Sequence, residues 1–353
     1  MTARIPDAEF GSLGPEAPSE HRVVTDIDET FDELVERIRD SRGGVIALVG
    51  ARGMGKSVLL RRLHETFPDT LLMSAPHEGD GGLRASLGET LGLGPHATFD
   101  EEATALAASP TGRALLLDDA HHFVQPIMGG LATFDALLAA ASKNCTKTAW
   151  VLVIDEVLWL FLQRARGSRP LFDHVIRLEP WREEQIIELL RTRTAQAGLT
   201  PTFERLLEKL PLNADEIDKQ EALARRASSY YRLLWDYAAG NPGVALHMWR
   251  RALGSDAGGG THVRFFQAPD TADLALLPDQ AVFVLRAVLQ LAPAAPREIG
   301  HATMLSHADV TDALRYALAR GYVESRDDRY TITWTWLRAI TLFLQRRHLL
   351  VTP

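Results

Sequence analysis

Apolar residues in the first half of the chain fall into short continuous runs, separated by segments with helical spacing. Five runs have the length and composition of buried strands, namely residues 45–49, 70–74, 113–119, 150–154 and 175–178. Between them, apolar residues recur every three or four positions, which predicts helices over 29–40, from Ser57 onward, over 83–91 and over 134–141. Strands that alternate with helices predict a parallel sheet covered on both faces.

After Pro180 the pattern becomes helical throughout. Glu183 to Gln196 is strongly amphipathic, and three further helices are expected over 203–210, 221–239 and 244–253. The segment Gly240-Asn241-Pro242-Gly243 breaks the chain before the last of these, because glycine and proline both interrupt helices. The pattern therefore predicts a helical region after the α/β core.

The C-terminal residues repeat a different pattern. Helices are expected over 280–291, 296–303 and 308–319, and a closing helix over 337–350. Between them lies a hairpin around Asp327-Asp328, in whose second arm Tyr330, Ile332 and Trp334 alternate with threonines. Three helices followed by a two-stranded hairpin predict a winged helix.

Composition shifts divide the chain into five parts. Residues 1–22 are rich in Pro, Gly, Ser and Glu without an apolar period and are expected to be a disordered leader. The glycine-rich stretch GSDAGGG, residues 254–260, is the best candidate for a domain boundary. We expect a leader (1–22), an α/β core (23–182), a helical lid (183–253), a linker (254–275) and a winged helix (276–353).

The most specific motif is a phosphate loop, G-x-x-x-x-G-K-[ST], at residues 50–57 (GARGMGKS). It follows a predicted strand and opens a predicted helix, the geometry in which backbone N–H groups surround a phosphate. ATP or ADP is thus the expected cofactor. The expected nucleotide contacts are Gly50, Gly53, Met54, Gly55, Lys56, Ser57 and Val58, with Lys56 on the β- and γ-phosphates and Ser57 a ligand of Mg²⁺.

Two apolar strands end in paired carboxylates. Asp118 and Asp119 follow the first strand, and we expect Asp118 to hold Mg²⁺ and Asp119 to orient the attacking water. Asp155-Glu156 follows the next strand and is the alternative metal pair. Chain order favours the earlier pair, since the later strand usually presents a polar residue to the γ-phosphate. Because aspartate is one methylene shorter than the usual glutamate at the second position, hydrolysis is expected to be slow.

Bulk composition narrows the function classes. The chain has 353 residues, 46% hydrophobic and 24% charged, which indicates a globular protein of two or three domains. A net charge of −8 argues against general nucleic-acid binding by the whole surface. Cys145 is the single cysteine and excludes a disulfide framework or a multi-cysteine metal site. Without a signal-peptide pattern or a membrane-length apolar run, we expect a cytoplasmic protein with no membrane insertion.

Taken in order, the phosphate loop, LLLDDAHH, WVLVIDE, VIRLEPW, the GNP segment and the winged helix resemble the AAA+/STAND group of P-loop ATPases, and within it the origin-recognition-like members. The resemblance covers about residues 23–353. It implies that Pro242 in the lid contacts the nucleotide. It also implies a trans-acting arginine, for which Arg164, Arg166 and Arg169 are candidates, whereas Gly243 stands where relatives often carry a lid arginine.

The expected function is a nucleotide-controlled switch or assembly regulator, with an effector protein and a nucleotide-dependent homo-oligomer as partners. The alternative is a DNA-associated ATPase whose winged helix binds duplex DNA. The winged-helix segment carries nine arginines against seven acidic residues, a formal charge of +2, while the remainder carries −10. Arg315, Arg320, Arg326 and Arg329 are its candidate DNA contacts, but Asp309 and Asp312 share the helix that carries Arg315 and Arg320, which disfavours DNA. A helicase, the third candidate function, would need a second motor lobe, whereas the remainder of this chain is expected to be helical.

Overall fold

The computed structural model describes residues 13–15, 26–39, 44–75, 87–89, 91–93, 98–110, 112–124, 129–167, 170–207, 216–255 and 260–351. The chain divides into two compact units. The lid unit comprises residues 1–26 and 180–270, and the core unit comprises residues 27–179 and 271–353. The winged helix thus belongs to the core unit. The helix expected over 83–91 lies mostly outside the described residues.

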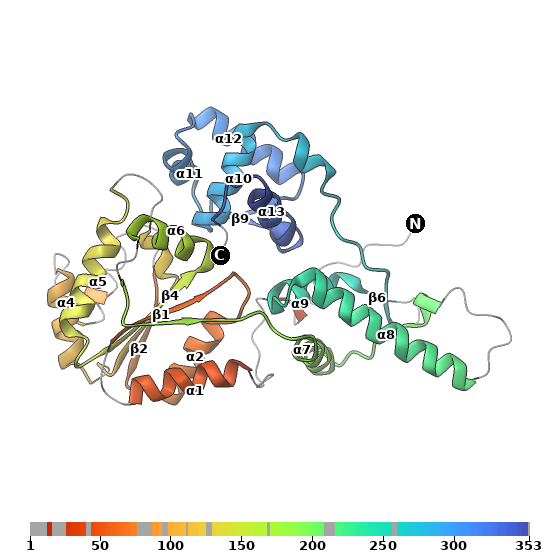
Figure 1. Cartoon of the computed structure of the whole chain (residues 1–353), viewed down its shortest axis with the longest axis horizontal. Coiled ribbons are helices and arrows are strands. Elements are labelled where there is room, and N and C mark those ends of the chain that lie inside the picture. The colour runs from red at the N-terminus through yellow and green to blue at the C-terminus, as the bar shows by residue number, and fades with distance from the viewer. Residues whose placement is uncertain are drawn as a thin grey trace. The chain divides into compact units, whose positions relative to one another are not determined.

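The core unit is built on a five-stranded parallel sheet, as the sequence predicts (Figure 1). Its strands are β1 (Gly44–Gly50), β2 (Thr70–Ser74), β3 (Ala114–Asp118), β4 (Ala149–Asp155) and β5 (His174–Arg177). Their spatial order is β2-β3-β4-β1-β5. Strand β4 therefore lies between the strand that leads to the phosphate loop and the strand that ends in the first carboxylate pair.

Helices cover both faces of the sheet, so its strands are apolar on both sides. Helices α1 (Asp26–Arg39) and α2 (Lys56–Thr66) pack on one face, and α4 (Phe99–Ala108), α5 (Ala132–Asn144) and α6 (Glu156–Arg166) pack on the other. Along β1 the side chains alternate, with Ile46 and Leu48 directed to α1 and α2 and Ala47 and Val49 to the opposite core. The predicted α/β sandwich is confirmed.

Helix α4 was not predicted. It begins with a capping box in which the Thr98 hydroxyl accepts a hydrogen bond from the Glu101 amide at 3.3 Å. The Glu101 carboxylate in turn accepts one from the Thr98 amide at 2.7 Å. The T-x-x-E signature was readable in the sequence, but the short alanine-rich helix buries only Glu102, Ala103 and Leu106 and so lacks a clear apolar period.

The winged helix contains the three helices, the hairpin and the closing helix that the sequence predicts, namely α10 (Asp279–Leu291), α11 (Pro296–Thr303), α12 (His307–Ala319), β8 (Val323–Arg326), β9 (Arg329–Ile332) and α13 (Trp334–Arg346). The turn η4 (Ala272–Leu276) was not predicted, and Trp334, expected in the hairpin, is the first residue of α13. Strands β8 and β9 form the antiparallel wing. Tyr322, fully buried, packs edge-on against Trp336 and closes the core between the wing and α13.

The lid unit is helical, with α7 (Glu183–Gln196), η3 (Glu204–Leu207), α8 (Glu216–Ala238) and α9 (Pro242–Ala252). Its core is a group of aromatic rings, namely Phe203, Tyr230, Tyr231 and Trp249. The indole N–H of Trp249 donates to the Thr194 hydroxyl at 2.8 Å, which satisfies a polar group in this buried cluster.

The GNP segment forms the corner between α8 and α9. Gly240 has a left-handed φ of 71°. There is no room for a side chain at this position, because a Cβ would lie 2.6 Å from the Trp181 carbonyl oxygen. Asn241 caps α9 by accepting from the Val244 amide at 3.1 Å, and Pro242 is buried in the first turn. The segment is thus explained by chain geometry alone.

Two boundaries differ from the expectation. Leu13, within the expected disordered leader, is fully buried, and the Gly14 carbonyl accepts from Arg193, so residues 13–15 are ordered on the lid unit. Within the expected linker, β6 (Leu253–Ser255) pairs with β7 (Thr261–Val263) as an antiparallel hairpin. A glycine-rich stretch serves a hairpin loop as well as a linker, and composition does not separate the two. Residues 256–259 lie outside the described part.

Candidate functional site

The phosphate loop connects β1 to α2 in the expected geometry. Gly53 and Gly55 adopt left-handed φ values of 92° and 93°, which side chains with a Cβ rarely tolerate. Gly55 is the N-cap residue of α2, so the loop passes directly into the helix N-terminus. Gly50 needs its hydrogen for another reason, since a Cβ there would lie 3.1 Å from the Leu178 Cβ. The glycines are therefore required by the backbone path.

Lys56 lies at the start of α2 and points back into this loop. Its ammonium donates to the Gly50 carbonyl at 2.6 Å and to the Ala51 carbonyl at 2.9 Å. Lys56 and Met54 are buried, whereas Ser57 and Val58 are exposed. A cation held against backbone carbonyls beside a helix N-terminus suits a phosphate group.

The first carboxylate pair lies beside this lysine. Asp118 ends β3, is buried, and its carboxylate accepts from the Asp119 amide at 2.9 Å. Asp119 has a left-handed φ of 53°. Burial, and next the neighbouring Asp118, raise the pKa of Asp119, while His122 and Lys56 oppose the shift. The structure thus gathers Lys56, Asp118 and Asp119 at one edge of the sheet.

The second carboxylate pair extends further along the edge. Strand β4 continues past the last residue paired with β3, so that Asp155 lies opposite Gly50 in the register of β1 and β4. The Asp155 carboxylate accepts from the Val157 amide at 2.9 Å and caps α6. Asp155 therefore has a structural role as the N-cap of α6.

Glu156 is the second member of that pair. Burial, and next Asp155, raise its pKa, whereas Arg177 and Lys56 lower it. Glu156 is therefore electrostatically connected to the same lysine as Asp119. Proximity alone does not separate the two pairs, and the roles of all four carboxylates remain predictions.

Two side chains near the site, those of Arg52 and His122, reach the winged helix, which the sequence did not suggest. Arg52, inside the phosphate loop, donates from Nη1 to the Ile332 carbonyl at 2.8 Å. Its guanidinium also lies 4.4 Å from the centroid of the Trp334 ring. No motif marks such a contact, because Arg52 occupies a variable position of the phosphate-loop pattern.

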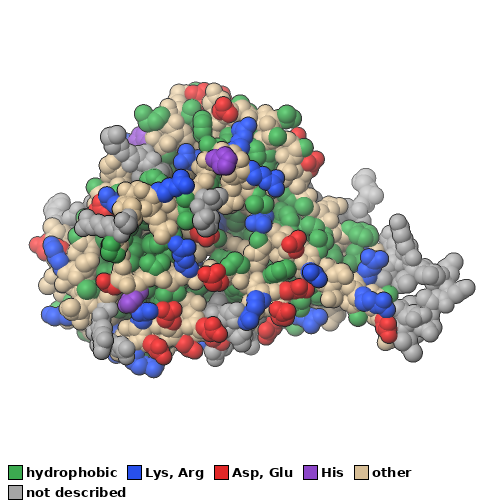
Figure 2. Space-filling view, in the orientation of Figure 1, with side chains coloured by type: hydrophobic (Ala, Val, Ile, Leu, Met, Phe, Trp, Pro, Cys, Tyr) green, Lys and Arg blue, Asp and Glu red, His purple; other side chains and the backbone are tan. Residues whose placement is uncertain are grey.

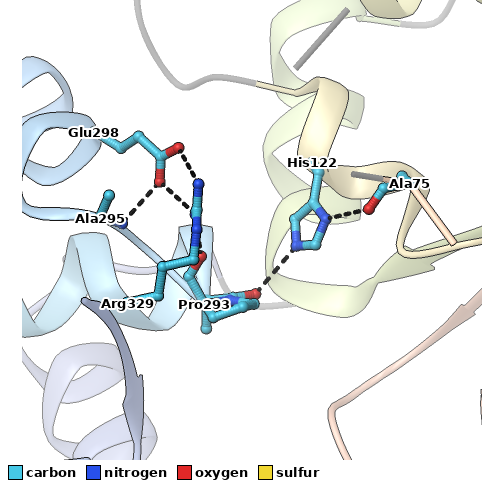
Figure 3. Close-up of polar contacts among 7 residues, drawn as sticks. Ala75, His122, Pro293, Ala295, Glu298 and Arg329 are labelled. Carbon is cyan, nitrogen blue, oxygen red and sulfur yellow. Dashed lines mark hydrogen bonds and ion pairs between the residues drawn. The ribbon is translucent and has the colours of Figure 1, made fainter. Parts of the chain in front are cut away.

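His122 makes the second contact. It belongs to the 3-10 turn η2 (Ala120–Phe123) that follows Asp119. Its Nδ1 lies 3.2 Å from the Ala75 carbonyl oxygen, at the end of β2, and its Nε2 lies 3.4 Å from the Ala292 carbonyl oxygen of the winged helix (Figure 3). His122 thus joins two backbone segments.

Within the described residues, no group of three or more His, Cys, Asp or Glu side chains is arranged to hold a metal ion by itself. Ser57 and Asp118 would instead share a metal with nucleotide phosphates, as is usual for Mg²⁺. The described helices also include none with the length and apolarity needed to cross a bilayer.

With this geometry established, comparison with known proteins identifies the core. Residues 38–162 match the family described as AAA domain. This segment is therefore similar to an AAA domain. The match contains the phosphate loop, both carboxylate pairs and η2, and it confirms the AAA resemblance of the core. No curated protein matches the chain in sequence.

Solved structures give a broader likeness. The chain is similar to Cdc6p from Pyrobaculum aerophilum, at 17% identity and a TM-score of 0.45, over 96% of this chain and 98% of that one. It is similar to a Walker-type ATPase of Pyrococcus abyssi, at 14% identity and a TM-score of 0.49, over 93% and 99%. It is also similar to the ORC1 protein of Aeropyrum pernix, solved with DNA, at 15% identity and a TM-score of 0.46, over 95% and 97%.

The candidate trans-acting arginines of the AAA domain differ in their surroundings. Arg166 forms an ion pair with Asp135 of α5, so its guanidinium is already bound within the domain. Arg164 is exposed on α6. Arg169 lies outside the described residues. Among the described candidates, Arg164 is the better placed to reach a neighbouring molecule.

Proposed function

We propose that the chain is an AAA+/STAND-type ATPase that acts as a switch, in which bound nucleotide controls whether the winged helix stays docked beside the phosphate loop. The contact of Arg52 with Ile332 and Trp334 carries this proposal. Arg52 lies in the loop that would enclose the phosphates. A nucleotide and the winged helix therefore act on the same few residues.

Binding of ATP or ADP would use the phosphate loop. The left-handed Gly53 and Gly55 direct the loop into the N-terminus of α2, and Lys56 would transfer its ammonium from loop carbonyls to phosphate oxygens. Met54, Ser57 and Val58 complete the cradle. Pro242 of the lid unit is proposed as a contact by the AAA+ resemblance; its burial in α9 neither requires nor opposes that role.

Hydrolysis would use the first carboxylate pair. Ser57 and Asp118 would hold Mg²⁺, which supplies charge neutralisation and orientation of the phosphates when it is bound. Asp119 would orient the attacking water by accepting a hydrogen bond from it. Its side chain is one methylene shorter than that of glutamate, so the carboxylate reaches less far toward the attacking water, which is consistent with slow turnover. Slow turnover suits a switch, because the nucleotide state then persists.

Control of docking requires ATP and ADP to differ in their preference for the docked form. A ligand shifts an equilibrium only through its differential affinity for the two states. We propose that ATP favours release of the winged helix and that release permits contact with an effector protein or a second copy of the chain.

The alternative, a DNA-associated ATPase, is disfavoured by how the winged helix uses its arginines. Arg329 was expected to meet phosphates, but it forms a two-pronged ion pair with Glu298 and donates to the Pro293 carbonyl (Figure 3). Arg320 forms an ion pair with Asp273. The Nη1 atom of Arg315 lies 3.6 Å from Oδ1 of Asp312. Figure 2 shows acidic and basic side chains interspersed over the face in view.

The test measures docking directly. A donor and an acceptor dye on Cys145 and on Ser325→Cys report the separation of the AAA domain and the wing, since Cys145 follows α5 and Ser325 is exposed on β8. Energy transfer is measured without nucleotide, with ADP and with a non-hydrolysable ATP analogue, and particle mass is measured in parallel. We expect lower transfer with the ATP analogue than with ADP. Equal energy transfer in all three states would contradict the switch. If the protein also binds duplex DNA tightly, with an affinity that falls steeply with salt, the DNA-associated function is the better proposal.

A further inference from the structure

A cavity of about 280 Å³ opens at the edge of the sheet opposite the phosphate loop. Its walls include Ile38, Asp69, Ala107, Arg113, Lys147 and Ala149. Asp69, Arg113 and Lys147 come just before β2, β3 and β4, at the amino ends of three parallel strands. The phosphate loop and both carboxylate pairs lie at the carboxyl ends of their strands, and the seven residues of β4 span about 20 Å. The cavity is therefore distinct from the nucleotide site.

The main chain around the cavity is held by backbone contacts. The Arg113 amide donates to the Asp69 carbonyl at 3.2 Å, and the Ala149 amide donates to the Arg113 carbonyl at 3.0 Å. Gly112, which also lines the cavity, packs closely on the end of α4, because a Cβ at this position would collide with the Leu106 carbonyl oxygen. The sheet and α4 thus fix the backbone from which the charged side chains extend.

The polar side of the cavity is cationic. Arg113 uses Nε for an ion pair with Oδ2 of Asp69, at 2.5 Å. Among the described residues, the two terminal amino groups of Arg113 and the ammonium of Lys147 have no hydrogen-bond partner. Two positive charges therefore face one carboxylate, in a chain whose net charge is −8. The two terminal nitrogens of a guanidinium match the two oxygens of a carboxylate.

The other side of the cavity is an apolar wall formed by Ile38, Ala107 and Ala149. Because a water molecule in the liquid occupies about 30 Å³, the cavity has room for roughly nine water-sized groups. This volume suits a small molecule better than a nucleotide or a peptide. An apolar wall that faces two cations matches a ligand with a negative end and a short hydrocarbon body, which an inorganic anion lacks.

We propose that this cavity binds a small carboxylate with a short apolar body. The ligand carboxylate accepts hydrogen bonds from the two terminal amino groups of Arg113 and is paired with the ammonium of Lys147, while its body lies against the apolar wall. Asp69 orients Arg113 by occupying Nε, which leaves the other two nitrogens for the ligand. The site adds a second ligand to the protein and does not depend on the proposed nucleotide switch.

The experiment titrates the full chain with benzoate and with hexanoate and follows the NMR signals of the ligand. We expect saturable binding of both, and each should displace the other. Benzyl alcohol, which has the same ring without the charge, should bind at least about tenfold more weakly than benzoate. Arg113→Gln should weaken benzoate binding by roughly tenfold or more, because it removes charge-assisted hydrogen bonds. Lys147→Gln should weaken it by a smaller factor, since its ammonium is exposed. Ala107→Leu fills the apolar wall, keeps both cations, and should also weaken binding.

Two further variants are controls. Lys143→Gln removes an exposed cation that pairs with Asp100 and does not line the cavity, so it should keep the parent affinity for benzoate. Lys56→Ala should keep it as well, because the phosphate loop lies at the other edge of the sheet. The inference is overturned if neither benzoate nor hexanoate binds saturably, if Arg113→Gln leaves their binding unchanged, or if Lys56→Ala abolishes it. Lys147→Gln and Ala107→Leu decide the outcome if Arg113→Gln folds poorly, and unchanged binding in both would then overturn the inference. A failure of nucleotide to alter energy transfer would contradict the proposed switch and leave this site unaffected.

Discussion

The Arg52 guanidinium lies over the ring of Trp334, with 4.4 Å between its central carbon and the ring centroid, and it donates to the Ile332 carbonyl just before that residue. A residue of the phosphate loop thus contacts the end of β9 and the start of α13. Position 52 is one at which the phosphate-loop pattern accepts any residue, so the contact is a property of this chain rather than of the motif.

Replacing Arg52 should loosen the winged helix without unfolding it. A charge-assisted hydrogen bond contributes about 1.5–3 kcal/mol and a cation–π contact about 0.5–1 kcal/mol, so Arg52→Gln should lower the docking constant by roughly tenfold or more. Energy transfer between the AAA domain and the wing measures this. Arg61→Gln, on the exposed side of α2, should leave transfer unchanged. Equal transfer in both variants would mean that Arg52 does not hold the winged helix.

Lys56→Ala should abolish tight binding of ATP and ADP while the chain remains folded. The ammonium bonds only loop carbonyls among the contacts described, so its loss removes phosphate binding rather than core packing. Calorimetric titration with both nucleotides tests the loss of binding, and a thermal unfolding curve tests whether the variant remains folded. Lys143→Ala, at an exposed ion pair with Asp100, is the control. Unchanged affinity in a folded Lys56→Ala protein would refute the nucleotide site.

The two carboxylate pairs are separable by turnover. Asp118→Asn and Asp119→Asn should bind nucleotide but hydrolyse it at least about tenfold more slowly, a loss of about 1.4 kcal/mol or more in the transition state. Asp155→Asn should have a smaller effect and normal stability, because asparagine also caps helices well. Loss of turnover in Asp155→Asn but not in Asp119→Asn would reverse the assignment.

Asp119 should also reduce stability at neutral pH. Its raised pKa means that the folded chain binds a proton more readily than the unfolded chain, so its contribution to stability is lost as pH rises from the ordinary value of 3.8 through the raised one. Asp119→Asn removes this effect and tolerates the left-handed φ. Urea unfolding should therefore find Asp119→Asn more stable than the parent above that window and no more stable below it. The opposite order would contradict the burial of the carboxylate.

Gly240→Ala tests the corner of the lid unit. The new methyl would meet the Trp181 carbonyl oxygen at 2.6 Å and the Pro180 Cβ at 2.8 Å, in addition to the strain of a left-handed φ. We expect a loss of at least about 2 kcal/mol in the free energy of unfolding. Gly198→Ala has a similar φ of 69° and nothing within 4 Å, so it should show the strain alone, about 1–2 kcal/mol. Equal losses in the two variants would mean that the contact with Trp181 is unimportant.

Periodicity predicted the sheet, the winged helix and the bounds of α7, because in each case burial is periodic and the strands are continuous apolar runs. It missed α4, whose ten residues bury few apolar side chains, and it took the β6–β7 hairpin for a linker. Local sequence also placed Lys56 and Asp118 at one edge of the sheet. Arg52 and His122 escaped prediction because their partners are backbone carbonyls 280 and 170 residues away, and a carbonyl carries no sequence signal.

Helix α6 is anchored at both ends, by the Asp155 cap at its start and by the ion pair of Arg166 with Asp135 at its end. Eleven residues of helix span about 16 Å, so the position of Arg164 relative to the nucleotide edge is set by a rigid rod rather than by a loop. Any neighbouring molecule that Arg164 serves must therefore approach to a fixed distance. A shift of β4 at the phosphate end would move Arg164 with it, so that the two ends of α6 would change position in step.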